Sequence, residues 1–140
     1  MADLVIRRAD EADQAIGDFI HEGFSRYGEQ NAVALNYDAF CFVAEGNDGS
    51  ILGALTGRAY YNEVHIGDLI VEEGSRRRGV GSRLVRAVEE AYQGKGYDVI
   101  TLSTFGFQAP DFYKKLGFQL EYVREHADPK LSKYFLRKDI

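Results

Sequence analysis

The residues with the clearest chemical potential form a basic, glycine-containing loop near the middle of the sequence. Residues 76–82 read Arg-Arg-Arg-Gly-Val-Gly-Ser, and an apolar helical pattern follows directly. Gly79 and Gly81 carry no Cβ and tolerate positive φ, so a ligand can approach the backbone there closely. The N-terminus of the following helix adds free N–H groups and partial positive charge. The loop is therefore predicted to bind a small anion such as a pyrophosphate.

Three known kinds of anion-binding loop compete for this segment. A Walker A loop requires lysine after its last glycine, and here Gly81 is followed by Ser82 and Arg83. A dinucleotide fingerprint requires a third glycine where this chain has Leu84. The pattern Gln/Arg-x-x-Gly-x-Gly/Ala is matched from Arg76 to Gly81. From the loop alone, a glycine-rich turn that binds nothing stays an open alternative.

Ionisable side chains on one expected strand are candidates for proton transfer. Residues 63–71 read as a strand, and strict alternation places His65 and Asp68 on opposite faces. With an ordinary pKa near 6.5, a histidine can accept a proton at neutral pH. His65 can also be a packed, hydrogen-bonded histidine, and Glu63 and Asp68 are further candidates for a base.

Composition limits the class of protein. The 140 residues, 45% of them hydrophobic, fit one globular domain, so a single domain over residues 1–140 is expected. One cysteine excludes an intramolecular disulfide and a cysteine-based zinc site, and three scattered histidines suggest no metal cluster. The net charge of −5 argues against general nucleic-acid binding. No long apolar run and no signal-peptide pattern is present, which favours a cytoplasmic location.

The elements expected around these residues give an α/β domain with a mixed sheet. Gly53 and Gly57 lie inside an expected strand and indicate a bulge or a close backbone approach. Cys41 is expected in the interior, within a buried strand. The expected strands are 4–8, 39–45, 51–61, 63–71, 99–103, 118–124 and 133–138. The expected helices run from Asp10 to about Phe24, from the glycine loop to Gly94, and from Ala109 to Leu116.

Two segments together resemble the GCN5-related N-acetyltransferase (GNAT) family. One is the Arg-x-x-Gly-x-Gly loop at residues 76–81, and the other is Phe-Tyr-Lys-Lys-Leu-Gly-Phe at residues 112–118. The order of the expected elements fits the same family, most strongly over residues 65–118. The resemblance implies a mixed, mostly antiparallel central sheet with splayed parallel strands flanked by helices, in a small bacterial single-domain member.

The resemblance also implies that acetyl-coenzyme A lies between the splayed strands. Backbone groups of Leu69, Ile70 and Val71 would hold the pantetheine arm and the acetyl carbonyl. Many family members carry Asn where this chain has Gly106, and Gln108 is the nearest amide that could replace it. The residues implied to bind the pyrophosphate portion are Arg76, Arg77, Arg78, Gly79, Val80, Gly81 and Ser82.

The same resemblance implies which residues donate and accept protons during the reaction. Tyr113 matches the tyrosine that commonly protonates the departing thiolate when an amine attacks the thioester. His65 stands where some relatives place a glutamate base. Cys41 has aromatic neighbours and no histidine near it in sequence, so direct transfer without an acyl-enzyme is expected.

The expected function is transfer of the acetyl group of acetyl-coenzyme A to a primary amine on a small molecule. A non-catalytic acyl-coenzyme A-binding or sensor module of the same fold is the alternative. The expected partners are the amine acceptor and a second copy of the chain in a homodimer, without metal, membrane or nucleic acid. The residues considered for the acceptor side are Glu22, Tyr27, Glu29, Tyr37, Tyr60, Tyr61 and Glu63.

Overall fold

The computed structural model describes residues 3–140, which divide into two compact units on either side of Leu35 and Asn36. Each unit is described by itself. The first contains one helix, α1 (Gln14–Gln30). Residues 3–10 form no regular element, so the strand expected over 4–8 is wrong. A strand requires a hydrogen-bonded neighbour, and this segment has none among the described residues.

Helix α1 begins and ends later than the sequence pattern predicted. Asp13 is its N-cap and accepts hydrogen bonds from the N–H groups of Ala15 and Ile16. Asp10 instead lies in a turn that precedes the helix, where its carboxylate accepts a hydrogen bond from the Ala12 N–H. The helix continues past Phe24 to Gln30, and Asn31 is its C-cap residue.

The second unit is built on one six-stranded sheet in the order β1-β2-β3-β4-β6-β5. All neighbouring strands are antiparallel except β3 and β4, which are parallel. The expected mixed, mostly antiparallel sheet with flanking helices is therefore confirmed. The strands are β1 (Asp38–Glu45), β2 (Ile51–Tyr60), β3 (Glu63–Val71), β4 (Val99–Phe105), β5 (Gln119–Arg124) and β6 (Lys133–Asp139). The helices are α2 (Val80–Tyr92) and α3 (Pro110–Lys115), with short 3-10 turns η1 (Glu73–Ser75) and η2 (Pro129–Leu131).

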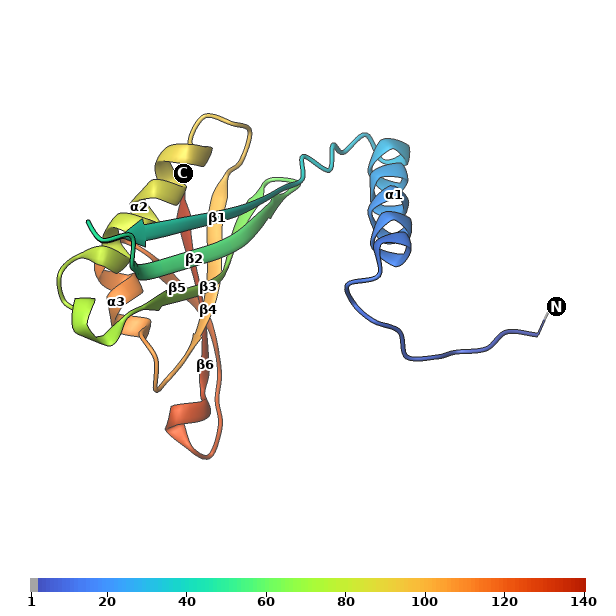
Figure 1. Ribbon diagram of the computed structural model, residues 1–140. Coiled ribbons are helices and arrows are strands. Elements are labelled where there is room, and N and C mark those ends of the chain that lie inside the picture. Colours follow the sequence, from blue (N-terminus) through green and yellow to red (C-terminus); the bar gives the residue numbers. More distant parts are fainter. Residues whose placement is uncertain (1–2) are drawn as a thin grey trace. The chain divides into compact units, whose positions relative to one another are not determined.

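Helix α2 covers one face of this sheet and contacts β1, β2 and β3 (Figure 1). Its buried residues recur at helical spacing and pack on the sheet, while Tyr92 at its end donates to Asp38 at 2.7 Å. Gly53 allows the close approach, since a Cβ there would lie 3.0 Å from a methyl carbon of Val80. The largest fully buried side chains are Leu55, Val64, Val85, Val88, Ile100 and Leu136.

Strand β1 is covered on one face only. Phe40, Phe42 and Ala44 pack against the core, while the residues between them are exposed. Cys41 is one of these exposed residues, so the prediction that it lies in the interior is wrong. The apolar run suggested burial on both sides, whereas the pleat of the strand turns alternate side chains away from α2.

A β-bulge in β3 changes which side chains share a face. Ile66 and Asp68 oppose consecutive residues of β2, so Gly67 between them has no partner. Because the extra residue reverses the alternation, Asp68 lies on the same face as His65. The prediction that these two residues lie on opposite faces is therefore wrong.

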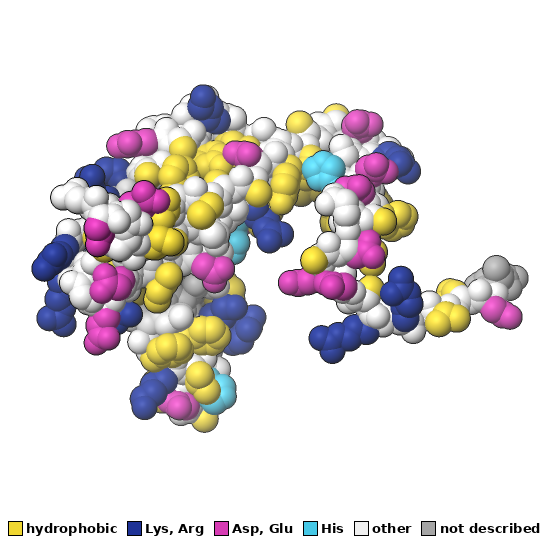
Figure 2. Space-filling view, viewed as in Figure 1, with side chains coloured by type: hydrophobic (Ala, Val, Ile, Leu, Met, Phe, Trp, Pro, Cys, Tyr) yellow, Lys and Arg dark blue, Asp and Glu magenta, His cyan; other side chains and the backbone are white. Residues whose placement is uncertain are grey.

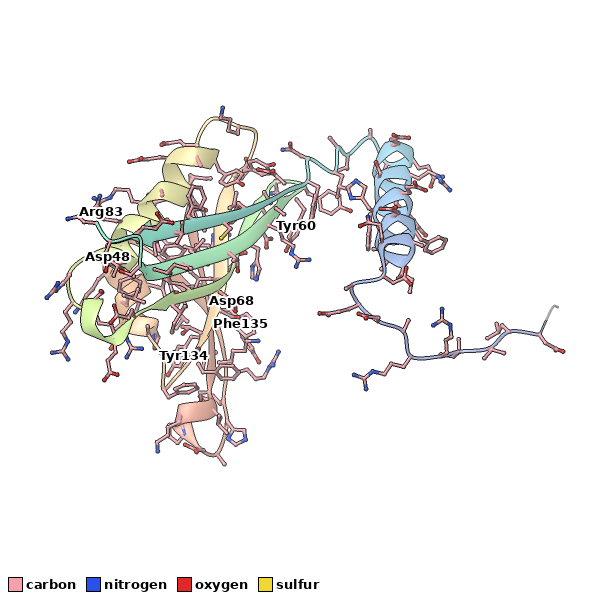
Figure 3. All side chains as sticks on the ribbon, in the orientation of Figure 1. Asp48, Tyr60, Asp68, Arg83, Tyr134 and Phe135 are labelled. Atoms are coloured by element: carbon pink, nitrogen blue, oxygen red, sulfur yellow. The ribbon has the colours of Figure 1, made fainter. Side chains whose placement is uncertain are left out.

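Charged and apolar side chains are interspersed on the surface of the second unit. In the space-filling view, hydrophobic patches cross the visible face with residues of both charges around them (Figure 2). Figure 3 shows Tyr60, Asp68 and Phe135 on the sheet and Arg83 on α2. Within residues 3–140, no helix combines the length and the apolar character that a membrane span requires.

Candidate active site

Strands β3 and β4 pair over only three residues before they separate. The pairs are Glu63–Val99, Val64–Ile100 and His65–Thr101. Beyond them β4 stays paired with β6, and β3 stays paired with β2. The edge of β3 that faces β4 is thus left without a strand partner after His65, and its backbone groups are available to a ligand.

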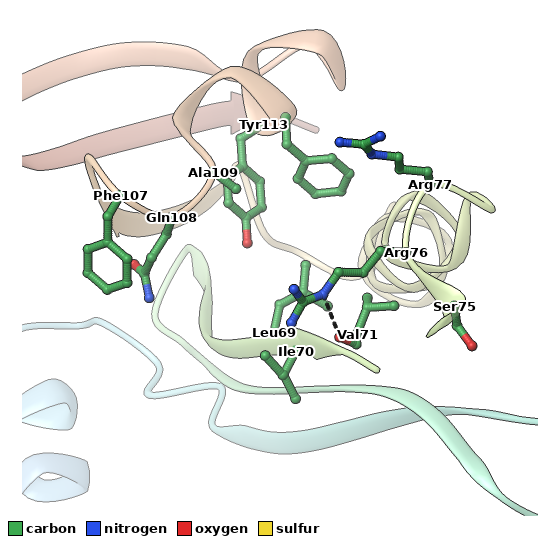
Figure 4. A pocket seen from close by; sticks show the side chains of 12 residues that line it. Leu69, Ile70, Val71, Ser75, Arg76, Arg77, Phe107, Gln108, Ala109 and Tyr113 are labelled. Carbon is green, nitrogen blue, oxygen red and sulfur yellow. Dashed lines mark hydrogen bonds between the residues drawn. The ribbon is translucent and has the colours of Figure 1, made fainter. Parts of the chain in front are cut away.

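A cavity of about 560 Å³ lies where the two strands have separated (Figure 4). This volume is in the range of small-molecule and cofactor sites. Of the residues predicted from the sequence, those that line it are Leu69, Ile70, Val71, Arg76, Arg77, Gly81, Gln108 and Tyr113. The residues outside its lining are His65, Arg78, Gly79, Val80 and Ser82. Four further lining residues were not predicted from the sequence: Ser75, Phe107, Ala109 and Phe112, of which the last three are near Tyr113 in sequence.

The glycine loop forms the end of the cavity at the start of α2. Gly79 is the N-cap residue with φ 78°, and no side chain caps the helix. The first helical bond runs from Arg83 N–H to the Gly79 carbonyl at 3.0 Å, so the N–H groups of residues 80–82 precede the helical ladder. Arg77 also has a left-handed backbone, with φ 66°, which the sequence did not indicate.

Gly81 lines the cavity but does not adopt the positive φ that the sequence analysis allowed for it. It lies in the first turn of α2 and is not among the residues with positive φ. A Cβ at this position would lie 3.0 Å from the Phe112 ring and 3.7 Å from a Val71 methyl group. The absence of a Cβ therefore favours the close packing of α2 against α3, and the positive φ considered for this position is not adopted.

Arg76 partly closes the same end of the cavity. Its Nε donates to the Val71 carbonyl at 3.1 Å, as Figure 4 shows. This bond satisfies one of the acceptors that β3 leaves unpaired where it diverges from β4. A ligand that pairs with the end of β3 must share or displace this contact.

Tyr113 places a phenol inside the cavity. The residue is 8% exposed, and its ring packs edge-on against Phe112 and Phe118. Its hydroxyl points toward β3 (Figure 4) and makes no hydrogen bond to another of the residues described. Burial raises the pKa of Tyr113 to about 12, so the phenol is neutral and can donate a hydrogen bond at physiological pH.

Helix α3, which carries Tyr113, is fixed at both ends. Pro110 occupies its first turn, and Gly117 follows its end with φ 95°. Lys138 on β6 donates to the Leu116 carbonyl at 2.7 Å and to Glu89 on α2 at 2.9 Å. These contacts hold α3 between α2 and the sheet and so determine where the phenol lies.

Steric crowding explains why position 106 is glycine, where many members of the resembled family carry asparagine. A Cβ at Gly106 would lie 2.3 Å from the Pro129 carbonyl oxygen, because η2 passes directly over this position. Gln108 lines the cavity, but its Oε1 accepts from Phe105 N–H at 2.8 Å and from Thr104 at 3.3 Å. Only its NH₂ group is left to contact a ligand.

His65 lies outside the cavity lining, on the face of the sheet opposite α2. Its Nδ1 is 2.9 Å from the Thr101 hydroxyl, which in turn donates to Glu63 at 2.7 Å. Burial lowers the pKa of His65 below 6.5, and the positive charges of Arg58 and Lys133 lower it further against the opposing effect of Glu63. The imidazole is therefore neutral at pH 7.

Other candidates for proton transfer or metal binding are less suitable. Asp68 accepts a long hydrogen bond from Thr56, at 3.4 Å. His126 is exposed, and its Nδ1 accepts a hydrogen bond from the Asp128 N–H. His21, in the first unit, is also exposed. Among residues 3–140 no group of three or more metal-ligating side chains is close enough together to hold an ion.

Comparisons with known proteins place these features in a family. The profile of the acetyltransferase (GNAT) family matches residues 8–118. This chain belongs to the GNAT family. A curated relative, blasticidin-S acetyltransferase of Streptomyces morookaense, is 31% identical over 104 residues, which are 74% of this chain and 76% of that protein.

Solved acetyltransferase structures have the same fold. An acetyltransferase from Bacillus cereus is 30% identical, with a TM-score of 0.77 over 96% of this chain and 98% of that chain. An aminoglycoside 6'-N-acetyltransferase complexed with coenzyme A is 19% identical, with a TM-score of 0.62 over 97% of each chain. The second likeness concerns the fold alone. The family resemblance drawn from residues 76–81 and 112–118 is thus confirmed, while the roles of individual site residues stay predictions.

The crowding at Gly106 gives a stability prediction. Gly106→Ala should lower the free energy of unfolding by about 1–3 kcal/mol, because the new methyl group overlaps the Pro129 carbonyl. Gly67→Ala is the matched control, since its nearest atom would be 3.6 Å away and a small change is expected. Urea unfolding of both variants measures the difference, and equal stabilities would show that η2 can move aside.

Proposed function

We propose that this chain is an N-acetyltransferase that moves the acetyl group of acetyl-coenzyme A directly to a primary amine on a small molecule. The observation that carries the proposal is the buried phenol of Tyr113, aimed into a cavity that opens where β3 and β4 separate. Membership of the GNAT family supports acetyl transfer as the reaction.

The residues around the cavity are suited to acetyl-coenzyme A as the acetyl donor. The unpaired edge of β3 at residues 69–71 offers sheet-like hydrogen bonds to the two amides of the pantetheine arm. The start of α2 offers N–H groups of residues 80–82 to the pyrophosphate, and Arg76, Arg77 and Arg78 add positive charge. The aminoglycoside 6'-N-acetyltransferase of the same fold that holds coenzyme A supports this choice of donor.

The proposed reaction has one displacement. The amine nitrogen attacks the thioester carbon, the C–N bond forms, and the C–S bond breaks with release of the thiolate. The Tyr113 hydroxyl donates a hydrogen bond to the sulfur as its negative charge develops. A thiol has an ordinary pKa near 8.5, well below that of this phenol, so hydrogen-bond donation is the main contribution and solvent supplies the thiol proton.

His65 is the proposed base. It is neutral at pH 7 because burial and two nearby cations disfavour its imidazolium form. It precedes Leu69 by four residues, or roughly 13 Å along an extended strand, so several water molecules in a hydrogen-bonded chain must carry the amine proton to it. Glu63 is less suited because one of its carboxylate oxygens already accepts from both Tyr60 and Thr101.

The acceptor is proposed from the chemistry of the relatives. The Streptomyces morookaense relative is named for acetylation of blasticidin S, which makes that antibiotic the first compound to test. The proposal also treats residues 1–140 as one acetyltransferase domain in the cytoplasm, as the length and composition suggest. The resemblance suggests that it works as a homodimer.

A thiol-release assay tests the proposed function. Acetyl-coenzyme A is incubated with the protein and blasticidin S, small primary amines, a lysine peptide or a peptide with a free N-terminus. Thiol appearance together with an acetylated small molecule in the mass spectrum supports the proposal. Binding of acetyl-coenzyme A without thiol release from any acceptor would favour the non-catalytic sensor instead.

Tyr113→Phe should lower kcat by roughly 10²–10³-fold, the usual loss when one hydrogen-bond donor to a developing negative charge is removed. The change removes one oxygen and preserves the ring packing against Phe112 and Phe118. Affinity for acetyl-coenzyme A should stay near the wild-type value, because the hydrogen bond strengthens only as the thiolate leaves. Wild-type kcat in this variant, when chemistry limits the rate, would remove Tyr113 from the mechanism.

Gly81→Val should weaken acetyl-coenzyme A binding by more than about tenfold, or ~1.4 kcal/mol. The new side chain would press on the Phe112 ring and enter the cavity at the start of α2. Arg77→Ala should have a smaller effect, since backbone N–H groups make most of the proposed contacts. Calorimetry on the folded variants decides, and unchanged affinity in Gly81→Val would contradict this placement of the coenzyme.

A further inference from the structure

A chain of hydrogen bonds lies beside the last β3–β4 pair before the strands separate. The Thr101 hydroxyl is 2.7 Å from Glu63 Oε2 and 2.9 Å from His65 Nδ1. Tyr60 donates to the same Glu63 oxygen at 3.2 Å. Three strands therefore contribute one connected group of side chains around the proposed base.

The distances determine the direction of these hydrogen bonds. A threonine hydroxyl has one hydrogen, so Thr101 can donate to Glu63 or to His65 but not to both. If it donated to His65, the Thr101 hydroxyl oxygen and Glu63 Oε2 would lie 2.7 Å apart with no hydrogen between them, so their lone pairs would repel. Thr101 therefore donates to Glu63 and accepts from the Nδ1–H of His65. This assigns the ring its Nδ1–H tautomer from heavy-atom positions.

We infer that Thr101 is a positioning residue that holds His65 as the Nδ1–H tautomer and thereby makes Nε2 the proton-accepting nitrogen. The inference rests on the proposed function, in which His65 is the base. Nε2 has no hydrogen bond to any of residues 3–140, and the His65 side chain is 38% exposed, so water reaches it. In the reaction Nε2 gains the proton that the amine nitrogen loses, and the imidazolium later returns that proton to solvent.

Thr101 also connects the ring to a negative charge. Glu63 Oε2 lies 3.9 Å from Nδ1, too far for a direct hydrogen bond, and the threonine hydroxyl joins the two groups. As Nε2 takes a proton, the Nδ1–H bond to Thr101 strengthens, because the donor becomes charged. The titratable and charged groups on this face of the sheet include Arg58 and Tyr60 on β2, Glu63 and Asp68 on β3, and Lys133, Arg137 and Asp139 on β6. Arg137 also forms ion pairs with Asp139 and with Glu121 on β5.

Long-range ¹H–¹⁵N NMR of ¹⁵N-histidine-labelled protein tests the tautomer directly. The spectra are recorded without the amine acceptor and without acetyl-coenzyme A. His65 is identified by the loss of its signals in His65→Gln. In the wild-type protein we expect a pyrrole-type signal at Nδ1 and a pyridine-type signal at Nε2. Thr101→Val should move the ring toward the Nε2–H form, and Thr101→Ser should restore the wild-type pattern.

Kinetics test whether the tautomer matters for the reaction. Thr101→Val should lower kcat roughly 10- to 100-fold, within the range for loss of a positioned base, and leave the KM for acetyl-coenzyme A unchanged. Its kcat/KM should reach the plateau at a lower pH than in the wild type, because the imidazolium loses a hydrogen-bond acceptor. Thr101→Ser should recover both values. Ser103→Ala, two residues farther along the same face of β4, is the matched control and should change neither.

The NMR and kinetic results together decide whether Thr101 positions His65. A wild-type Nε2–H tautomer, or a tautomer that Thr101→Val leaves unchanged, overturns it even if His65 is the base. A changed tautomer with wild-type kcat in Thr101→Val, when His65→Gln is slow, also overturns it. Wild-type kcat in His65→Gln overturns the base proposed for the reaction, and with it the catalytic part of the inference, while the NMR result stands as a separate measurement.

Discussion

The structure depends on a pair of parallel strands that stops after three residues. Past the His65–Thr101 pair, β3 and β4 follow different neighbours, so the inner edge of β3 has N–H and C=O groups without a strand partner. Buried backbone groups must be satisfied by protein, water or ligand. Arg76 satisfies one of them at Val71. The cavity, the start of α2 and the phenol of α3 all lie around this unsatisfied edge, which is why it is the natural place for an extended ligand.

Burial acts in opposite directions on the two groups proposed for proton chemistry. It raises the pKa of Tyr113 and lowers that of His65, because in each case it disfavours the charged form. Both groups are therefore neutral at physiological pH, one able to donate a hydrogen and the other able to accept one. The two groups lie in different places. Tyr113 lines the cavity, whereas His65 lies on the face of the sheet opposite α2, at the point where β3 and β4 separate. These surroundings favour the proposed roles, with Tyr113 as hydrogen-bond donor and His65 as proton acceptor.

The sequence predicted the order of the strands and the main helices well, because turns and apolar periodicity are local signals. It also led to the cavity residues on β3, the loop and α3 through the family motif. It failed where a neighbour decides the conformation: the bulge at Gly67 depends on the register of β2, and Gly81 depends on the ring of Phe112. The exclusion of asparagine at position 106 depends on η2, which lies more than twenty residues away in sequence. The Thr101–Glu63 bond joins two strands and has no signature in either segment alone.

A crystal structure of the protein with acetyl-coenzyme A is the most direct test of the account. The account predicts the pyrophosphate on the N–H groups at the start of α2, the pantetheine arm along residues 69–71, and the thioester sulfur within hydrogen-bonding reach of the Tyr113 hydroxyl. A coenzyme bound elsewhere, or a thioester sulfur remote from Tyr113 with the acetyl group facing solvent, would contradict it.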